Sequence, residues 1–496
     1  MTFQTIRRRA SMLAALATLA ACGTVGPDYS VPPQATIKRP AAAAPFIGSS
    51  EAPSAFKAEA LPPQWWRLFQ DPVLDGLIEQ AFTANTDLRA AAANLARARA
   101  LQQETAAAGD PLIGVSAAPA FGRPSAAAKG LSQALPDAWS HDAGVSVSYQ
   151  ADLFGKIARA VEAAGADTQA AQAGYDLVRV TVAADTARAY ADACAATRQI
   201  DVARQSAALQ RSFVDSTERR IRAGRGTALD ASRARSQLEQ LNAALPPLQA
   251  QRRTAQYRLA ALTGRLPGEA DKLAPACRAA PRLMAQIPVG DGAALLRRRP
   301  DIRQAERNLA SASARIGVAT ADLYPSISLG LSAGSSGALD RFGAGNALRW
   351  SLGPLISWTL PATGAARSRI AQAQAGSDLA LARFDGVVLN ALREVESAMT
   401  VYARELERSA ALKAAREQSA LASAQSHTLY DHGKIDFLAV LDADRTLASA
   451  DAASAASDAQ LAGDQVALFL ALGGGWEQPT CERCAAVPPA GKAAAP

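Results

Sequence analysis

The segment DIRQAERNLASASARIGVATADLYP, residues 301–325, has a second copy in the same chain. It aligns without a gap with DLRAAAANLARARALQQETAAAGDP, residues 87–111, at an offset of 214 positions, and 10 of the 25 positions are identical. Because alanine-rich sequences match easily, the identities at Asp, Arg, Asn and Pro are the informative ones. Such self-similarity at a fixed spacing indicates an internal duplication.

The alignment continues at an offset of 209 positions through the rest of each copy. The matched pairs include Tyr149/Trp358, Gly155/Gly364, Asp176/Asp385, Gly224/Gly433, Leu259/Leu468 and Gly264/Gly473. Between the two blocks the first copy is five residues longer, in a stretch that is typical of a hairpin loop. The pattern predicts a first repeat over 72–264 and a second over 291–473.

Both repeats predict the same order of elements. A helix, at roughly 73–108 and 292–322, ends before a proline. Two strands with period-two alternation follow, at about 111–121 and 143–153 in the first repeat and about 325–334 and 350–360 in the second. Proline-free stretches then predict long helices at 155–222 and 364–431, and return helices at 228–263 and 437–472. Pro246 and Pro247 should interrupt the first return helix.

Residues 1–21 have the parts of an export signal: three arginines at 7–9, then an apolar core at 12–19 that is too short to span a bilayer. The sequence LAAC at 19–22 fits a bacterial lipobox, in which Cys22 receives an S-diacylglycerol and an N-acyl chain. The alternative is an ordinary secretory signal that happens to contain a cysteine. The segment 22–71 is then predicted to be a lipidated tether that leads to an equatorial region. Its first residues, GTVGPDY, should run along the outside of a membrane barrel.

Composition argues against several classes of function. Without the signal the net charge is about +4, which is too small to indicate a nucleic-acid-binding protein. No later apolar run is long enough for a transmembrane helix. The three histidines are scattered and suggest no catalytic grouping, so we expect no enzyme, no cofactor and no metal site. Residues 265–290 form a linker, and 474–496 a Pro/Ala-rich tail in which Cys481 and Cys484 form a local disulfide or lie in a disordered segment.

Strands with one polar and one apolar face are typical of a membrane barrel wall, although a soluble β-sandwich shows the same alternation. Four strands cannot close around a pore, and an open edge in lipid leaves backbone groups unpaired. A barrel built from this chain must therefore be shared between subunits. Trp139, Tyr149, Trp350 and Trp358 fit interfacial girdles, or else an ordinary core.

Two segments carry a resemblance to a known family: PPQWWRLFQDPVLDGLIEQAFTANTDL (62–88) and LLRRRPDIRQAERNLASASARIGVATADLYPSISLG (295–330). They resemble the outer-membrane factors, the TolC-type channels of tripartite efflux pumps. With Cys22 followed by VGPDY (25–29), the chain is most similar to the NodT/OprM-like lipoprotein branch. The resemblance covers roughly residues 25–475.

The family implies a mainly α-helical fold with a small β part. Three chains, each contributing four strands, would form a twelve-stranded outer-membrane barrel and a helical tunnel through the periplasm. The implied partners are two further copies of the chain, a periplasmic adaptor, an inner-membrane transporter of the resistance-nodulation-division (RND) type and outer-membrane lipid. The main alternative is a lipid-anchored periplasmic coiled-coil spacer without a pore, and a lipid-anchored enzyme is a distant third.

The turns between the long helices are the expected functional sites. By resemblance they contact the adaptor, and the contact candidates are Gly224, Arg225, Gly226, Thr227, Gly433, Lys434, Ile435 and Asp436. The family places a hydrophobic and an acidic ring at the tunnel aperture, and the motif FLAVLDADR puts Leu438 and Asp442 at those positions, one helical turn apart. A second acid found in some members is replaced by Ala439, so the acidic constriction should be simpler. Asp442 as a solvated surface charge is the alternative.

The first turn is electrically different from the second. In the repeat alignment Arg233 occupies the position of Asp442. We expect Arg225, Asp230 and Arg233 to form pairs with a neighbouring hairpin that lock the aperture.

Overall fold

The computed structural model describes residues 23–476 except 124, 128, 129, 131, 274–276, 278, 284 and 359–362. The signal 1–21, Cys22, Cys481 and Cys484 lie outside the described residues, as does the predicted end of the last strand at 359–360. The chain divides into two compact units. Within the described residues, unit 1 comprises 23–33, 94–172 and 304–384, and unit 2 comprises 34–93, 173–303 and 385–476. Each unit contains parts of both repeats, so a single repeat does not form a compact unit of its own.

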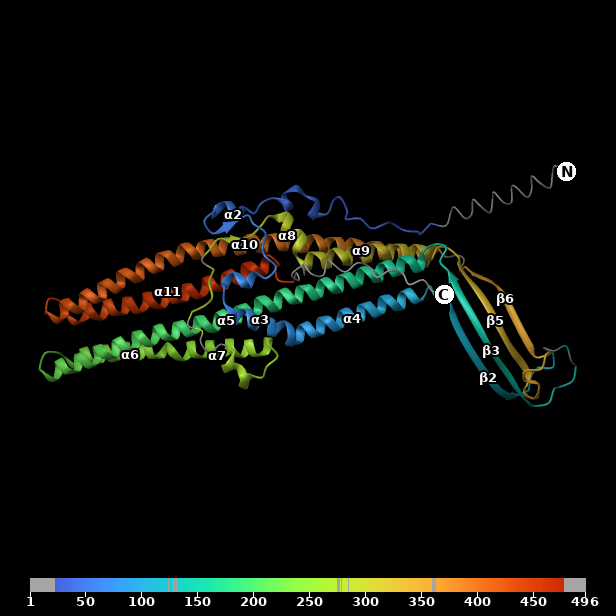
Figure 1. Cartoon of the computed structure of the whole chain (residues 1–496), viewed down its shortest axis with the longest axis horizontal. Helices are drawn as coiled ribbons and strands as arrows, with labels where there is room; N and C mark the ends of the chain where they lie inside the picture. The colour runs from blue at the N-terminus through green and yellow to red at the C-terminus, as the bar shows by residue number, and fades with distance from the viewer. Residues whose placement is uncertain are drawn as a thin grey trace, which may run out of the picture. The chain divides into compact units, whose positions relative to one another are not determined.

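Unit 1 contains a four-stranded antiparallel sheet with the order β2-β3-β5-β6 (Figure 1). Its strands are β2 (Leu112–Gly122), β3 (Ala138–Ala151), β5 (Ser326–Ala338) and β6 (Leu348–Ser357). β3 begins five residues before the predicted start, because Ala138–Asp142, a stretch without clear alternation, pairs with the end of β2. β5 likewise runs four residues beyond its predicted end, where it pairs with the first residues of β3.

The register puts apolar side chains of all four strands on one face of the sheet. Ile113 lies opposite Val147, Val147 opposite Leu331, and Leu331 opposite Leu352. Ser146, Ser332 and Ser351 lie on the other face. Side chains on the apolar face are exposed, as far as 78% for Val115 and for Trp350. Within this chain the face is not a buried core.

Exposed aromatic side chains lie at both ends of the apolar face. At the loop end, Trp139 lies against Phe121 with ring centroids 5.5 Å apart. Trp350 lies further into the sheet, level with Val145 of β3 in the register. At the helix end, Tyr149 is on β3 and Trp358 follows β6. All of them are exposed, which agrees with girdles and not with a core.

The helices make up most of the rest. They are α2 (Ile47–Glu51), α3 (Pro72–Ala84), α4 (Thr86–Ala107), α5 (Lys156–Arg222), α6 (Ala228–Ala243), α7 (Leu245–Leu262), α8 (Gly292–Arg298), α9 (Pro300–Ala321), α10 (Thr363–Asp431) and α11 (Phe437–Ala471). A short parallel pair of strands, β1 (Phe56–Lys57) and β4 (Ile287–Pro288), belongs to unit 2. No helix in the described ranges has both the length and the apolar character that crossing a bilayer requires.

Three of the predicted helices are each divided in two. The first return helix breaks at Ala244, just before the Pro246–Pro247 pair that was expected to interrupt it. The predicted single helices 73–108 and 292–322 are wrong, because Asn85 and Arg299 adopt extended backbone between α3 and α4 and between α8 and α9. Pro300 disfavours helical geometry at Arg299, and Asn85 caps α4 by accepting the backbone N–H of Asp87 and Leu88.

At both breaks a side chain hydrogen bonds to the last carbonyl of a return helix. The Asn85 amide donates to the carbonyl of Leu262, the last residue of α7, at 3.1 Å. Arg299, which is the repeat counterpart of Asn85, donates to the carbonyl of Ala471, the last residue of α11, at 2.8 Å. These carbonyls have no partner inside their own helices. We call the two arrangements the helix-end clamps.

The second clamp is reinforced by charge. Arg299 is buried and binds the carboxylates of Asp301 and Glu394 at 2.6 and 2.9 Å. Arg298 Nε donates to the carbonyl of Leu472 at 3.0 Å. The RRPD motif therefore ties the start of α9 to the end of α11.

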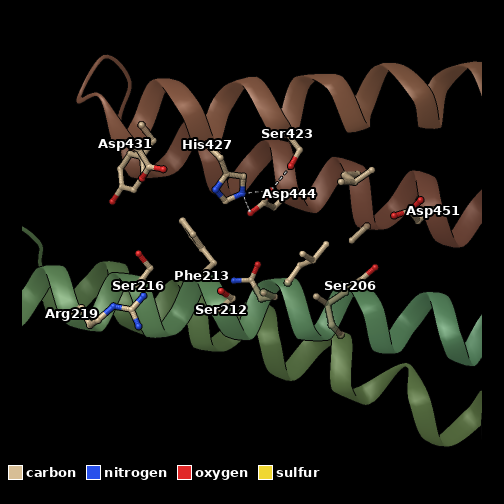
Figure 2. Close-up of a pocket in the computed structure, with 16 residues that line it drawn as sticks. Ser206, Ser212, Phe213, Ser216, Arg219, Ser423, His427, Asp431, Asp444 and Asp451 are labelled. Carbon is tan, nitrogen blue, oxygen red and sulfur yellow. Dashed lines mark hydrogen bonds and ion pairs between the residues drawn. The ribbon is translucent and has the colours of Figure 1, made fainter.

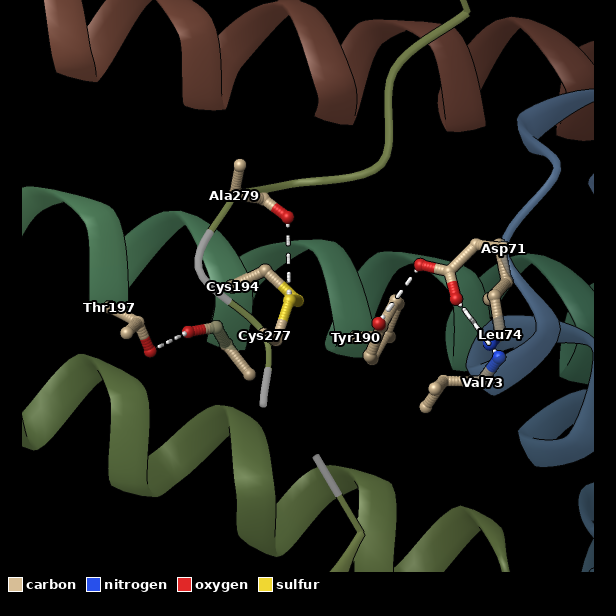
Figure 3. Close-up of a disulfide and its surroundings, with 9 residues drawn as sticks. Asp71, Val73, Leu74, Tyr190, Cys194, Thr197, Cys277 and Ala279 are labelled. Carbon is tan, nitrogen blue, oxygen red and sulfur yellow. Dashed lines mark hydrogen bonds between the residues drawn. A yellow bond between two sulfur atoms is a disulfide. The ribbon is translucent and has the colours of Figure 1, made fainter. Parts of the chain in front are cut away.

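The core of unit 2 lies around these clamps. The rings of Trp65 and Phe469 stack with centroids 4.7 Å apart. A disulfide joins Cys194 on α5 to Cys277 in the linker, with Cα atoms 5.1 Å apart (Figure 3). The sequence did not predict this bond, because the two cysteines are 83 residues apart and carry no spacing motif.

Replacing Arg299 tests the clamp. We expect Arg299→Ala to lower the free energy of unfolding by about 3–5 kcal/mol, because it leaves a carbonyl and two carboxylates without their buried partner. Thermal unfolding of the detergent-solubilised chain followed by circular dichroism measures this. Arg297→Ala is the matched control, since Arg297 is exposed on the same short helix. Equal stability of the two variants would contradict the clamp's importance.

Candidate functional site

The turn between α5 and α6 reverses the chain through a left-handed glycine. Gly224 has φ +72°, and its N–H donates to the carbonyl of Ile221 at 2.9 Å. The N–H of Arg225 donates to the carbonyl of Arg220 at 2.8 Å. These two bonds are the Schellman arrangement. The α10–α11 turn repeats them at Gly433 (φ +72°), Tyr430, Lys434 and Leu429.

Each return helix begins with a capped N-terminus. Thr227 and Asp230 form a reciprocal capping box, in which the Thr227 hydroxyl accepts the N–H of Asp230 and the Asp230 carboxylate accepts the N–H of Thr227. In the second turn Asp436 accepts the N–H of Ala439 at 2.9 Å. Ala439 is the counterpart of Asp230 and cannot return the bond.

The three candidate locking charges differ in their surroundings. The Asp230 carboxylate is engaged in its own cap, at 2.7 Å from the Thr227 hydroxyl. Arg225 and Arg233 are exposed. Among the described residues none of the three forms an ion pair. Their pairing with a neighbouring chain stays a prediction.

Leu438 and Asp442 lie on one exposed face of α11. Leu438 is 46% exposed and Asp442 is also exposed, whereas Phe437, Val440 and Leu441 on the opposite face are buried. The sequence motif therefore separates into an inner packing face and an outer face that carries both aperture candidates. In the isolated chain this outer face contacts solvent.

The first return helix presents an equivalent face. Leu229 on α6 is the repeat counterpart of Leu438 and is 57% exposed. Arg233 follows it by one turn, in the place of Asp442. The two faces therefore have the same apolar residue and opposite charges.

The buried faces pack together in a cluster that we call the tip cluster. Phe213 of α5 stacks on Phe437 of α11, with centroids 5.3 Å apart and planes 15° apart. Tyr430 and His427 of α10 also contact Phe213. The other buried members are Ala207, Val214, Ala234, Leu238, Val440 and Leu441. Figure 2 shows Phe213 pointing from α5 toward α10 and α11.

A side-chain pair ties the two helices of each hairpin, with the acidic partner on the outgoing helix α5 in the first hairpin and on the return helix α11 in the second. In the first hairpin Glu218 of α5 binds Arg235 of α6 at 2.6 Å, and the hydrogen bond from Arg235 lowers the pKa of Glu218. In the second, His427 of α10 lies 3.0 Å from Asp444 of α11. The repeat offset of 209 aligns Glu218 with His427 and Arg235 with Asp444.

The second pair is the more enclosed of the two. The Asp444 side chain is 17% exposed and also accepts a hydrogen bond from the Ser423 hydroxyl at 2.7 Å (Figure 2). The Arg235 side chain is 61% exposed. His427 belongs to no local motif, because the histidines are scattered along the sequence. Comparing the aligned side chains of the two repeats would have identified His427, because it occupies the position of Glu218.

A cavity of about 390 Å³ lies beside the tip cluster between the two hairpins. Its lining is mixed, with apolar residues such as Leu209 and Leu447 beside the polar residues Ser206, Ser212, Ser216, Arg219, Asp431 and Asp451. In the described part of the chain no three His, Cys, Asp or Glu side chains are grouped to hold a metal ion. The described part of this region consists of packed helices with exposed outer faces.

Comparison with known proteins gives a consistent result. The family model described as "Outer membrane efflux protein" matches residues 77–265 and 293–474, once in each repeat. Nodulation protein T of Rhizobium leguminosarum bv. trifolii is 30% identical over 416 residues, which cover 83% of this chain and 88% of that protein. The toluene efflux pump outer membrane protein TtgF of Pseudomonas putida is 30% identical over 472 residues, covering 92% of this chain and 95% of that protein.

A solved structure agrees as well. The outer-membrane channel OprN superposes with a TM-score of 0.85 at 35% identity, covering 92% of this chain and all of that one.

The Glu218–Arg235 and His427–Asp444 pairs predict that the two hairpin turns are stabilised to different degrees. Asp444→Ala removes the acceptor of two side-chain hydrogen bonds, one of them to an ionisable group, and bonds of that kind contribute about 1.5–3 kcal/mol. We therefore expect amide hydrogen exchange at 430–436 to accelerate about tenfold or more. Arg235→Ala is the matched control in the first hairpin, where an exposed pair contributes little and exchange at 221–227 should hardly change. Equal effects in both hairpins would contradict the difference in enclosure.

Proposed function

The chain belongs to the outer membrane efflux protein family, and from that premise we propose that it is the outer-membrane channel of a tripartite efflux pump. It exports drugs or other small molecules from the periplasm without changing them chemically. Substrate would be delivered by an RND-type transporter of the inner membrane through a periplasmic adaptor. The relative TtgF is described as a toluene efflux pump outer membrane protein, which supports a role in the export of small molecules for this chain by similarity.

The observation that carries the proposal is the open, one-sided sheet. Its apolar face is exposed over all four strands, and among the described residues β2 and β6 each pair with one neighbouring strand only. In lipid each unpaired backbone group costs several kcal/mol, so these edges need partner strands. Three chains placed edge to edge give twelve strands and a closed barrel. A coiled-coil spacer would leave the apolar face without a function.

The aperture of the tunnel is assigned to the second hairpin. Leu438 and Asp442 of three chains form an apolar and an acidic ring, which narrows the path, repels anions and attracts cations. The exposure of both side chains on one face of α11 supports this assignment. Arg225, Asp230 and Arg233 of the first hairpin are the proposed locking charges, and for Asp230 pairing would compete with its capping bonds.

The turns are the proposed adaptor contact. Gly224–Thr227 and Gly433–Asp436 present nearly identical backbones, so one adaptor motif fits both. The side chains differ, with Arg225 and Thr227 in the first turn and Lys434 and Asp436 in the second. Adaptor affinity should therefore differ between the two turns.

Membrane attachment has a second component in this proposal. Cys22 carries the S-diacylglycerol and N-acyl chains of a mature lipoprotein, and these chains enter the inner leaflet of the outer membrane. Two or more acyl chains give stable anchoring, since each buried CH₂ contributes about 0.8 kcal/mol. The barrel would hold the protein in the membrane as well.

The aperture assignment predicts a change in conductance. Leu438→Ala combined with Asp442→Ala removes the side chains that narrow the path, so single-channel conductance in planar bilayers should rise severalfold and cation preference should fall. The matched control is Leu229→Ala alone, at the counterpart of Leu438, because Arg233 is itself a proposed locking charge. If the double variant conducts like the parent, or the control rises equally, the assignment to the second hairpin is wrong.

A further inference from the structure

The four strands of the described sheet contain one carboxylate and one guanidinium. Asp142 lies on β3 and Arg349 on β6, whereas β2 and β5 contain no Asp, Glu, Lys or Arg. His141, next to Asp142, points to the opposite, apolar face, where it is buried and lies 2.8 Å from the Ser335 hydroxyl. Two charged side chains are therefore isolated in a sheet that is otherwise free of charge.

The two charged side chains pair with each other. The Arg349 guanidinium donates to the Asp142 carboxylate, although β5 lies between their strands. Gly334 of β5 is the register partner of Arg349 and has no side chain, which leaves room for the guanidinium to cross β5. All three residues belong to unit 1. The pair thus spans three strands, and its two charges cancel.

The pair lies on the polar face of the sheet, near the loop end. In the register Asp142 lies opposite Ser336, and Arg349 is on the same face as Ser351. Asp142 is the fifth residue of β3 and Arg349 the second of β6, counted from the loop ends of these strands. The remaining polar-face positions of β3 and β5 are serine, glycine, alanine or glutamine. Hydroxyl groups and bare backbone therefore dominate this face.

We propose that Asp142 and Arg349 remove charge selection from the loop end of the barrel by cancelling each other. In the barrel proposed above, the apolar face meets lipid and the polar face lines the lumen. Three copies of either residue alone would form a ring of like charges, and such rings select solutes by sign. With both present, cationic, anionic and neutral solutes leave the barrel alike, and selection by sign is left to the aperture. The inference rests on the proposed barrel.

Stabilisation of the sheet does not explain the pair. The two side chains are 48% and 56% exposed, and ion pairs with such exposure contribute little to the free energy of unfolding. The backbone ladders between β3, β5 and β6 fix the register without them. The cancellation of charge inside the lumen is the effect that remains.

The local potential is measured with a reporter thiol on the full-length protein in lipid nanodiscs at low salt. Ser351→Cys provides the thiol, because Ser351 is exposed two residues from Arg349 on the polar face. Cationic and anionic methanethiosulfonate reagents of similar size are compared, and mass spectrometry follows the peptide that carries residue 351. In the parent reporter the ratio of the cationic to the anionic rate should be within about twofold of the ratio for 2-mercaptoethanol, a neutral thiol.

Breaking the pair should shift this ratio in opposite directions. A unit charge about 10 Å away in water changes each rate about twofold, with opposite sign for the two reagents. Arg349→Gln should therefore raise the ratio about fourfold, and Asp142→Asn should lower it about fourfold. The double variant should return to the ratio of the parent. Arg315→Gln, which removes a cation of α9 outside the sheet, is the control and should leave the ratio unchanged.

A second reporter separates failure of the pair from failure of the barrel. Leu352→Cys lies on the apolar face next to Ser351, and lipid should protect it from both reagents. If both reporters react equally fast, the barrel is wrong and the inference falls with it. If only Ser351→Cys reacts but both single variants keep the parent ratio, the barrel stands and the cancellation is wrong. A double variant that keeps the shift of either single variant also contradicts the cancellation.

Discussion

The requirement that backbone groups in lipid be hydrogen bonded is the constraint on which the rest of this molecule depends. One chain supplies four strands with an exposed apolar face and with β2 and β6 as its edges. Such a sheet is stable in a membrane only when other copies pair with both edges. In the proposed channel, the helix turns of three chains supply the constriction and the adaptor contact surface.

Duplication of one unit explains how a single chain supplies four strands. Differences between the side chains of the two repeats explain why equivalent positions can have different functions. The backbone devices are nearly the same in both repeats: the left-handed glycines 224 and 433, the helix breaks at 85 and 299, and the carbonyls that those breaks bind. The side chains at equivalent positions differ in charge. Asn85 becomes Arg299, the Glu218–Arg235 pair becomes His427–Asp444, and Arg233 becomes Asp442. Backbone geometry is thus retained, while the charges of the side chains differ at one helix-end clamp and near the hairpin turns.

Much of the fold could be predicted from the sequence because its periodic patterns are long. α5 and α10 begin and end within one residue of the proline-free stretches that predicted them. The break at Asn85 was missed because a capping residue inside a continuous alanine-rich pattern gives a weak signal, whereas Pro300 gave a usable signal for the break at Arg299. The prediction that GTVGPDY runs along the outside of a barrel is wrong, because residues 24–29 pack against α5 and α9. This packing, the Cys194–Cys277 bond and the tip cluster depend on contacts between distant segments. No local pattern encodes such contacts. The alignment of the two repeats does, however, place the Glu218–Arg235 pair at the same positions as the His427–Asp444 pair.

The central claim is that three copies of this chain close one barrel. Native mass spectrometry of the full-length protein, released from lipid nanodiscs or mild detergent, tests it most directly. A single species with the mass of three chains is the predicted result, and it should persist at concentrations far below those of chance association. A stable monomer or dimer in the same conditions would contradict the account, because a four-stranded or eight-stranded arrangement would then satisfy the edges of β2 and β6 by some other means.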